Sequence, residues 1–328
     1  MSPTWHGVDL WSLTLPTPSI VTIGKFDGVH RGHQALIRQV VERARSTGRL
    51  SAVVTFDPPP PVVLRPEVPY LALTDLAERV RLIAALGVDV VAVCPFTRDL
   101  AQLPARAFAA ALCQRLKMVE LWCGPDFAMG RGREGTVPVL RQLGSEMGFT
   151  VTTVAPLLVD GAVVSGSRIR ALLAAGEVSA AARLLGRYPC VHGRVVPGDQ
   201  RGRQLGVPTA NLAVPPQRLI PRDGIYAVFV RWEAEVRGGV ASIGTRPTFG
   251  GGPRTVEVHL FDFSGDLYGC DLEVLFAERL RDELAFREVE ALVSQMRQDI
   301  ATARAILARL PWPGPLSAAS VPTPASVD

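Results

Sequence analysis

Two histidines three residues apart follow a glycine-bearing turn near the start of the chain, in the segment SIVTIGKFDGVHRGHQALI. Their spacing puts His30 and His33 on one side of the first turn of a helix. The amino end of a helix offers free N–H groups and a positive dipole to phosphate, and Gly32 leaves room for phosphate to approach the backbone. Two imidazoles there can donate hydrogen bonds to a triphosphate as charge builds on the α-phosphoryl group and the leaving pyrophosphate.

The two histidines could also have structural or metal-binding roles. One or both could cap the turn or pack in a core. Metal ligation is not expected, because no third His, Cys or carboxylate lies nearby at the spacing of a zinc site. We therefore interpret the segment as a nucleotide-phosphate site.

A second set of chemical groups lies in the other half of the chain, in GRVVPGDQRGRQLGVPTANL. Its glycines allow a close-approach loop whose backbone amides can wrap phosphates. Thr209 and Asn211 follow, two residues apart, so in an extended chain they face the same side. Their hydroxyl and amide oxygens are suited to Mg²⁺. The glycines of the loop are Gly193, Gly198, Gly202 and Gly206.

A glutamate on a later strand completes this second set. Glu257 stands between apolar neighbours in TVEVHLFDFSGDLYG. Partial burial beside a metal-bound phosphate would tune it as the general base for a primary alcohol. The alternative is an ordinary solvent-facing strand glutamate opposed by an arginine.

The lysine content limits which kinase chemistry is available. Lys25 and Lys117 are the only lysines, and no G-x-x-x-x-G-K-[ST] segment occurs. A phosphate-binding lysine of the P-loop or protein-kinase type is therefore excluded from the second half of the chain.

The first half alternates short β-branched runs with amphipathic stretches, which predicts a parallel, doubly wound sheet. Gly48, Gly87 and Gly148 are placed as helix ends. In such a sheet ligands bind outside the carboxyl ends of the strands, where the two histidines fall. The predicted strands are 20–24, 52–56, 88–94, 119–123 and 150–154, and the predicted helices are 33–47, 75–86, 104–117 and 136–147.

After Tyr188-Pro189 the pattern changes to short strands separated by Gly, Pro and Asp, which predicts an antiparallel barrel or sandwich. A helix at 286–310, with one apolar stripe, is expected to pack on it. We expect domains at 1–186 and 187–310, and a disordered tail at 311–328, rich in Pro, Ala and Ser. The predicted strands are 191–196, 225–232, 239–244, 255–263 and 272–276.

The composition is that of a globular protein, with 48% hydrophobic and 20% charged residues in 328. The start of the chain lacks the layout of a signal peptide, and no apolar run approaches the roughly 18 residues of a membrane helix. We expect a cytoplasmic protein that contacts no membrane. The net charge of +4 comes without a basic run, so small phosphorylated ligands, and no nucleic acid, are expected. The five cysteines are widely spaced and are interpreted as free thiols.

The segment GKFDGVHRGH resembles the signature of the nucleotidyltransferase superfamily. Its particular residues resemble those of the bacterial bifunctional riboflavin kinase/FMN adenylyltransferase (FAD synthetase) family. CGPDFAMGRGREG, at 123–135, is similar to that family's G-x-D-F-x-F-G-x-x-R-x-G loop. VSGSRIR, at 164–170, is similar to its I-S-S-T-x-I-R motif. The resemblance implies that ATP and its phosphates are bound by Gly24, Phe26, Asp27, Gly28, His30, Gly32, His33, Asp126, Arg133, Ser165, Ser167, Arg168 and Arg170.

The chain departs from this pattern at several positions. Gly166 and Ser167 stand where Ser and Thr are usual, Met129 replaces a Phe and Lys25 an Asn. The segment TFDPPP, at 55–60, lacks a His that many relatives carry. We expect an active site with altered affinity.

The second half is similar to the riboflavin kinase family in four segments: PTAN, IGTRPTFGG at 243–251, VEVHLFDF, and LRDELAF at 280–286. The resemblance implies that Thr209 and Asn211 bind Mg²⁺ and that Glu257 accepts the ribityl hydroxyl proton, while His259 is structural. It also implies a six-stranded antiparallel barrel whose final helix and preceding loop help to cover the flavin. The expected ATP- and flavin-binding residues are Gly193, Gly198, Gly202, Gly206, Pro208, Thr209, Asn211, Arg246, Arg281 and Glu283.

The resemblance spans roughly residues 18–310. It implies an α/β Rossmann-like nucleotidyltransferase domain and a β-barrel riboflavin kinase domain with a C-terminal helix. The expected function is ATP-dependent phosphorylation of riboflavin to FMN, then transfer of AMP to FMN to give FAD. One alternative is a riboflavin kinase with a decayed first domain; another is a non-catalytic flavin- or nucleic-acid-binding regulator. The expected ligands are ATP, Mg²⁺, riboflavin, FMN and FAD, and weak self-association is left open.

Overall fold

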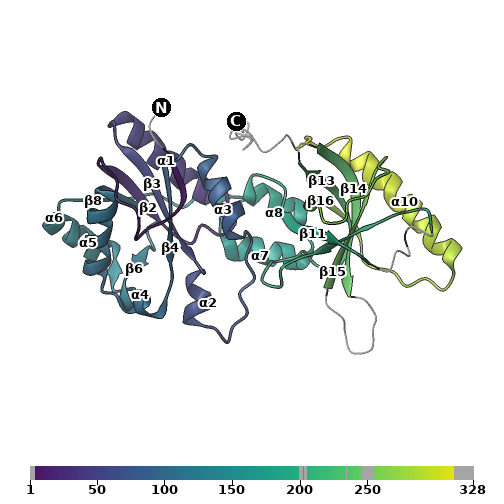
Figure 1. Cartoon of the computed structure of the whole chain (residues 1–328), viewed down its shortest axis with the longest axis horizontal. Coiled ribbons are helices and arrows are strands. Elements are labelled where there is room, and N and C mark those ends of the chain that lie inside the picture. Colours follow the sequence, from purple (N-terminus) through teal and green to yellow (C-terminus); the bar gives the residue numbers. More distant parts are fainter. Residues whose placement is uncertain (1–3, 199–201, 203–204, 234, 246–253, 314–328) are drawn as a thin grey trace. The chain divides into compact units, whose positions relative to one another are not determined.

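The computed structural model describes residues 4–198, 202, 205–233, 235–245 and 254–313 (Figure 1). The chain divides into two compact units, Met1–Gly166 and Ser167–Asp328. Each unit has its own sheet and its own core, and each is described by itself.

The first unit is built on a parallel sheet of six strands in the order β1-β4-β3-β2-β5-β8. The five strands predicted from the sequence are present, which confirms the parallel α/β class. The edge strand β1 was not predicted, and it pairs with β4 through an irregularity between His6 and Val8. The strands are β1 (Trp5–Asp9), β2 (Ser19–Ile23), β3 (Leu50–Asp57), β4 (Val90–Pro95), β5 (Met118–Cys123) and β8 (Thr150–Thr153).

Helices cover both faces of this sheet. α1 and α3 pack on Val53 and Val91 through Ile37 and Ile83, whereas α5 and α6 contribute to a core on the opposite face. Because both faces are covered, a central strand such as β2, SIVTI, is buried along its whole length. The helices are α1 (Arg31–Ser46), α2 (Pro60–Leu64), α3 (Leu76–Ala84), α4 (Arg98–Gln102), α5 (Ala105–Leu116) and α6 (Val137–Met147).

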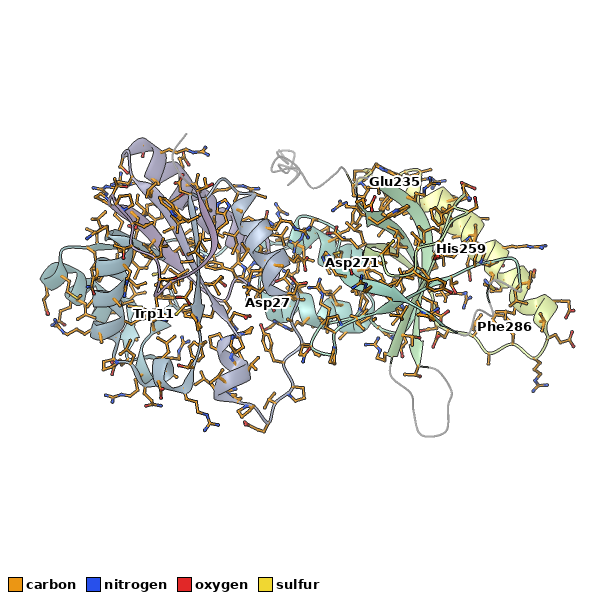
Figure 2. All side chains as sticks on the ribbon, in the orientation of Figure 1. Trp11, Asp27, Glu235, His259, Asp271 and Phe286 are labelled. Carbon is orange, nitrogen blue, oxygen red and sulfur yellow. The ribbon has the colours of Figure 1, made fainter. Side chains whose placement is uncertain are left out.

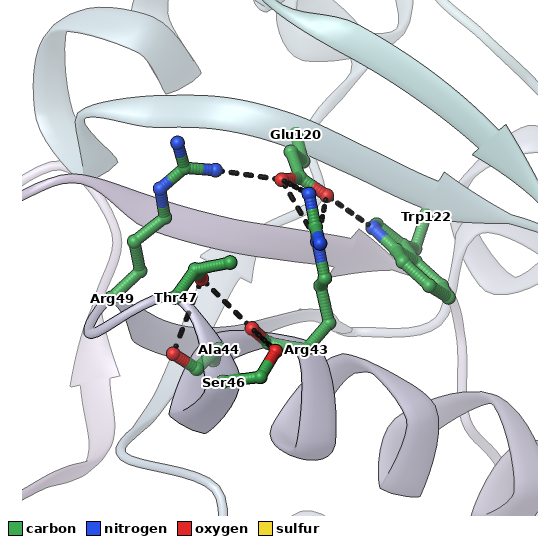
Figure 3. A network of polar contacts seen from close by, with 7 residues as sticks. All are labelled: Arg43, Ala44, Ser46, Thr47, Arg49, Glu120 and Trp122. Atoms are coloured by element: carbon green, nitrogen blue, oxygen red, sulfur yellow. Dashed lines mark hydrogen bonds and ion pairs between the residues drawn. The ribbon is translucent and has the colours of Figure 1, made fainter.

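A buried carboxylate ties α1 to the sheet (Figure 3). Glu120, on β5, accepts hydrogen bonds from Arg43 (3.0 Å), Arg49 (2.6 Å) and the Trp122 indole (3.0 Å). Burial alone would raise the pKa of Glu120, but the hydrogen bonds from Arg43 and Trp122 outweigh it and hold the pKa below its ordinary value. The charged network therefore fixes the carboxyl end of α1, the helix whose amino end carries the two histidines.

The second unit is a closed barrel in the order β11-β12-β15-β14-β13-β16, with antiparallel pairs throughout. This confirms the six-stranded barrel that the resemblance implied. The predicted strands are present, and the short strand β12 was missed. The strands are β11 (Cys190–Val196), β12 (Ala210–Ala213), β13 (Gly224–Trp232), β14 (Glu235–Thr245), β15 (Arg254–Leu260) and β16 (Asp271–Arg281).

The second unit also contains helices. α10 (Val289–Leu307) packs on the outside of the barrel, where Ala303 and Leu307 meet Phe229 and Leu275, as the apolar stripe predicted. α7 (Gly166–Ala175) and α8 (Val178–Leu185) precede the barrel, and α8 packs against β16. Contacts between residues thus place α7 and α8 in the same unit as the barrel. The tail expected to be disordered lies outside the described residues from 314 onward.

Candidate active sites

The first candidate site lies at the carboxyl edge of the parallel sheet. Strands β3 and β4 extend the sheet on one side of β2, and β5 and β8 extend it on the other. The strand order therefore reverses between β2 and β5, the point at which open α/β sheets bind ligands. Thr22 pairs with Trp122 across these strands, so the turn after Gly24 and the loop after Gly124 leave the sheet side by side.

The turn between β2 and α1 has an unusual backbone. Phe26 and Val29 both have positive φ, at 47° and 37°, and both side chains are buried. The Phe26 ring packs in the core beneath α1, and a side chain on Gly24 would meet that ring at 3.1 Å. Phe26 and Gly24, which were expected to bind ATP, thus shape the turn from below.

The two histidines stack on each other at the start of α1. Their ring centroids are 3.6 Å apart at an interplanar angle of 19°. His30 caps the helix, and its Nδ1 accepts a hydrogen bond from the His33 N–H (3.3 Å), so the ring carries its proton on Nε2. The space that a side chain on Gly32 would fill holds the His30 ring at 3.2 Å. Gly32 therefore makes room for an imidazole, whereas the sequence suggested room for phosphate.

The environment keeps His33 neutral. Burial lowers the pKa of His33 well below its ordinary value, and His30 and then Lys25 lower it further. Its Nδ1 is buried and has no hydrogen-bond partner among the described residues. A neutral imidazole donates one N–H hydrogen bond and cannot act as a cation, so its contribution to phosphate chemistry is directional.

Asp27, which Figure 2 labels, is hydrogen-bonded by other groups of the protein. Its carboxylate is buried and accepts hydrogen bonds from the N–H groups of Leu73 and Thr74, both at 3.0 Å, and from the Tyr70 hydroxyl at 2.9 Å. The Gly28 N–H donates to the Thr74 hydroxyl (3.0 Å). Asp27 and Gly28, both expected to bind ATP, are thus bound to the segment 70–74.

The loop at 123–135 closes on itself. Gly130, with φ of 78°, sits so close to Ala105 that any side chain would overlap its backbone. Arg133 donates to the carbonyl of Asp126 (3.1 Å), and both side chains are exposed. These two predicted ATP-binding residues therefore come together at the same edge of the sheet as the histidines, because the loop follows β5.

The motif at 164–170 begins beside the histidines. The Val164 carbonyl lies 3.4 Å from the place of a side chain on Gly32, and α7 starts two residues later, at Gly166. The predicted phosphate-binding residues Ser165, Ser167, Arg168 and Arg170 thus flank or form the first turn of a helix. Their assignment to ATP stays a prediction.

The second candidate site lies on neighbouring barrel strands. Asn211 on β12 pairs directly with Glu257 on β15, so their side chains share one face of the sheet. The Thr209 hydroxyl donates to Glu257 Oε2 (3.3 Å). His259 donates from Nδ1 to the Pro208 carbonyl (2.8 Å), consistent with the structural role expected for it. The three residues predicted to do the chemistry therefore meet at one point.

The glycines of the second half serve different purposes. A side chain on Gly198 would overlap the Asn211 amide, and one on Gly202 would overlap the Val207 carbonyl and lie 3.3 Å from the Thr209 hydroxyl. These two glycines let the loop approach the site. The other two have different surroundings. Gly193 makes room for Leu212 in the barrel wall, and Gly206 has a φ of 77° in a turn.

Two further residues that were predicted to bind flavin contact other parts of the protein. Arg281 is bound to Asp299 of α10 through two nitrogens, at 3.0 Å and 2.6 Å, so it anchors that helix to the barrel. The Glu283 carboxylate lies against Gly244, where burial and then Asp223 raise its pKa. Arg246 lies outside the described residues.

Comparisons with known proteins match both halves of the chain. A family model described as FAD synthetase matches residues 13–168, and one described as riboflavin kinase matches residues 185–307. A protein from Pseudomonas fluorescens is 41% identical over 88% of this chain and 93% of its own length. One from Escherichia coli K12 is 39% identical over 87% of this chain and 91% of its own. Both are named bifunctional riboflavin kinase/FMN adenylyltransferase.

A solved structure from Streptococcus pneumoniae, described as a macrolide-efflux protein, superposes with a TM-score of 0.84 at 32% identity. It covers 90% of this chain and 97% of its own. In the described part of this chain, none of the helices combines the length and apolar character needed to cross a membrane. The identity and coverage of the curated relatives, together with the two matched domains, show that the chain belongs to the bifunctional riboflavin kinase/FMN adenylyltransferase family.

Proposed function

We propose that the chain makes FAD from riboflavin in two ATP-dependent steps, at the two sites described above. The barrel site phosphorylates riboflavin to FMN, and the sheet-edge site joins AMP to FMN. The observation that carries this division is that Asn211 on β12, Glu257 on β15 and Thr209 just before β12 meet in the barrel, while His30 and His33 lie together at the start of α1. Two chemically distinct sets of residues support two reactions.

In adenylyl transfer, a phosphate oxygen of FMN attacks the α-phosphorus of ATP and pyrophosphate leaves. The His30 Nε2–H and the neutral His33 ring donate hydrogen bonds that strengthen as charge builds on the transferring phosphoryl group. Arg168 and Arg170, in the first turn of α7, are proposed to bind the triphosphate with Ser165 and Ser167. A helix start is suited to that role because its N–H groups are free.

In the kinase step, Glu257 accepts the proton of the ribityl hydroxyl while that oxygen attacks the γ-phosphorus of ATP and ADP leaves. The Thr209 hydroxyl holds one carboxylate oxygen of Glu257 and fixes its orientation. Because phosphoryl transfer depends mainly on positioning and charge stabilisation, backbone amides of a glycine-bearing loop can take the place of a phosphate-binding lysine.

The residues at this site fit a magnesium ion. Thr209 and Asn211 offer hard hydroxyl and amide oxygens on the face that carries Glu257, and Gly198 brings the loop backbone against the Asn211 amide. When bound there, Mg²⁺ would neutralise the ATP phosphates and orient the transferred group. Thr209 and Asn211 are the proposed protein ligands.

Replacing Thr209 with alanine tests the magnesium proposal. The variant is expected to raise the KM for ATP about 10-fold and to need more Mg²⁺ for half-maximal FMN formation, because one ligand is lost. Thr209→Ser, which keeps the hydroxyl, should stay near the parent. A Mg²⁺ titration of riboflavin phosphorylation measures both. An unchanged magnesium midpoint in Thr209→Ala would contradict the assignment.

Chromatography of the products formed from riboflavin, ATP and Mg²⁺ tests the proposed function as a whole. We expect FMN first and FAD afterwards. FMN without FAD would favour the alternative of a decayed first domain, and no turnover of ATP would favour a binding protein. The cytoplasm, where ATP is plentiful, is the proposed location. The absence of a nucleic-acid partner and weak self-association stay predictions.

We propose that the functional domains meet near residue 186, although α7 and α8 pack with the barrel unit. A fragment starting at Ser167 is expected to fold and to phosphorylate riboflavin without making FAD. One starting at residue 187 loses α8, whose buried Val178, Leu184 and Leu185 contribute about 1.5–3 kcal/mol each when fully buried. It should retain kinase activity with a lower Tm. Thermal unfolding of both fragments measures the difference, and equal Tm values would show that α8 is dispensable.

A further inference from the structure

The turn that leads to the histidines needs support from outside itself. A positive φ is unfavourable for residues with a side chain, and Phe26 and Val29 both adopt one within four positions. Such a conformation persists only where the surrounding structure determines it. The position of His30, which directly follows Val29, depends on this turn.

One support comes from the segment that precedes α3. Thr74 is the centre of it, because its hydroxyl accepts from the Gly28 N–H (3.0 Å) and donates to Asp27 Oδ1 (3.2 Å). The Thr74 N–H and the Tyr70 hydroxyl also donate to Asp27, at 3.0 Å and 2.9 Å. A carboxylate beside a triphosphate would repel it. Here both Asp27 oxygens accept from donors of segment 70–74; Asp27, Leu73 and Thr74 are buried and Tyr70 is half-buried.

The other support is a buried guanidinium. The Arg79 side chain is only 2% exposed. It donates from Nη1 to the Lys25 carbonyl (3.1 Å), which also accepts from the Thr55 hydroxyl (3.0 Å). Its Nη2 lies 3.6 Å from Asp57 Oδ1, and its Nε has no hydrogen-bond partner among the described residues.

Burial of this cation is costly, because charged groups lose their hydration in a protein interior. Burial lowers the pKa of Arg79, while Asp27 and then Asp57 oppose that effect. An arginine stays charged even so, since its ordinary pKa lies far above neutrality. The fold therefore holds a full positive charge against the Lys25 carbonyl, at the start of the turn that leads into α1.

We propose that Tyr70, Thr74 and Arg79 are positioning residues for adenylyl transfer. They hold the turn 25–28 from two directions, at the Lys25 carbonyl and at Asp27 and Gly28, so that His30 and His33 point where the phosphoryl group reacts. None of the three touches the reacting atoms. The inference rests on the proposed role of the histidines and extends the site to a segment that no family motif in the sequence marked.

The first test replaces Thr74 with valine, which keeps the shape and removes both hydroxyl contacts. In the full-length chain, kcat for FAD formation from FMN should fall about 10- to 100-fold, the scale of a 1 Å misplacement, with KM for ATP changed less than about 3-fold. Thr74→Ser should restore kcat to within about 3-fold of the parent. Riboflavin phosphorylation by the same preparation should be unchanged.

Thr22→Val is the matched control. Thr22 is a buried threonine on β2 whose hydroxyl has no hydrogen-bond partner in the described part of the chain, so its loss should leave both activities within about 2-fold. For Arg79, Met keeps the length and removes the charge, and it should lower kcat about 10- to 100-fold. Arg79→Lys should recover part of this loss, because it restores a cation near the Lys25 carbonyl.

The outcomes separate positioning from simple stability. If Thr74→Val lowers Tm but keeps kcat per folded molecule within about 2-fold of Thr22→Val, the proposal is overturned. Equal losses in Arg79→Lys and Arg79→Met would overturn the charge argument. Should Thr74→Val fail to fold, Tyr70→Phe removes one contact and is expected to lower kcat about 3- to 10-fold; unchanged kcat there would also overturn the proposal. A parent chain that makes no FAD would instead refute the proposed function.

Discussion

Replacing either His30 or His33 with alanine is expected to lower FAD formation from FMN about 100-fold or more. This is the usual scale for removing a preorganised donor to a transition state. The two rings stack at 3.6 Å, so each also fixes the orientation of the other. The double variant should therefore lose less than the product of the single losses, because one ring without the other is already misplaced.

The two variants should differ in stability. His30→Ala removes the side chain that caps α1, which typically costs about 0.5–2 kcal/mol, whereas His33→Ala removes no cap. Tm measured beside kcat separates these effects. His6→Ala is the matched control, since His6 binds the Val88 carbonyl (2.9 Å) away from the turn. FMN formation from riboflavin should persist in all three variants. Full FAD synthesis in both site variants would show that the assignment is wrong.

The dependence on pH follows from the lowered pKa of His33. A histidine with a depressed pKa is neutral at pH 7 and becomes charged only well below its ordinary titration range. The His33 contribution to FAD formation should therefore be constant from neutral to moderately acidic pH. A loss of kcat with midpoint near pH 6.5 that disappears in His33→Ala would contradict this environment.

Replacing Glu257 with glutamine should lower riboflavin phosphorylation about 10²- to 10⁴-fold while riboflavin still binds. The amide keeps the size of the side chain and can still accept from the Thr209 hydroxyl, but it cannot take the proton. The loss should therefore appear in kcat, with little change in the KM for riboflavin. Supplied FMN should still be converted to FAD, because that reaction uses the other site.

Glu278→Gln is the control for this change. Glu278 is an exposed glutamate on β16 of the same barrel, and its replacement should leave kcat within about 2-fold. Initial rates of FMN formation and the affinity for riboflavin measured by fluorescence provide the two readouts. Normal phosphorylation by Glu257→Gln would make Glu257 an ordinary strand residue and would require another base.

Much of the fold could be predicted because strand and helix patterns are local. The five predicted strands of the sheet each stand out as a short run rich in apolar or β-branched residues, and glycine marked the helix ends at positions such as 148, where φ is 82°. Strand β1 was missed because WHGVD is short and polar, and Gly7 interrupts it. It forms a strand by pairing with β4, which lies about 85 residues later in the sequence, and no local pattern reveals such a pairing.

Where chemistry and motif coincide, the structure brings the predicted residues together, as it does Thr209, Asn211 and Glu257, and their roles stay predictions. Resemblance assigned Arg281 to the ligands, yet in the structure it binds Asp299 of the final helix. It also assigned Asp27 to ATP, whereas its partners stand at 70–74. The capping signal of Asp75 and Glu78 marks the start of α3, but nothing local indicates that Thr74 contacts Gly28. Such contacts become visible only when distant segments fold together.

The closed barrel gives the kinase site a property beyond its contacts. In an open sheet, an edge strand can slip by two residues and keep its faces, but in a closed ring a slip at one pair must be matched by the other pairs around the circumference. The alignment of Asn211 with Glu257 is therefore set by the ring as a whole. If the ring fixes this alignment, the backbone amides of β12 should exchange slowly with deuterated solvent. Insertions within β12 or β15 should also be tolerated far less than insertions in the loops.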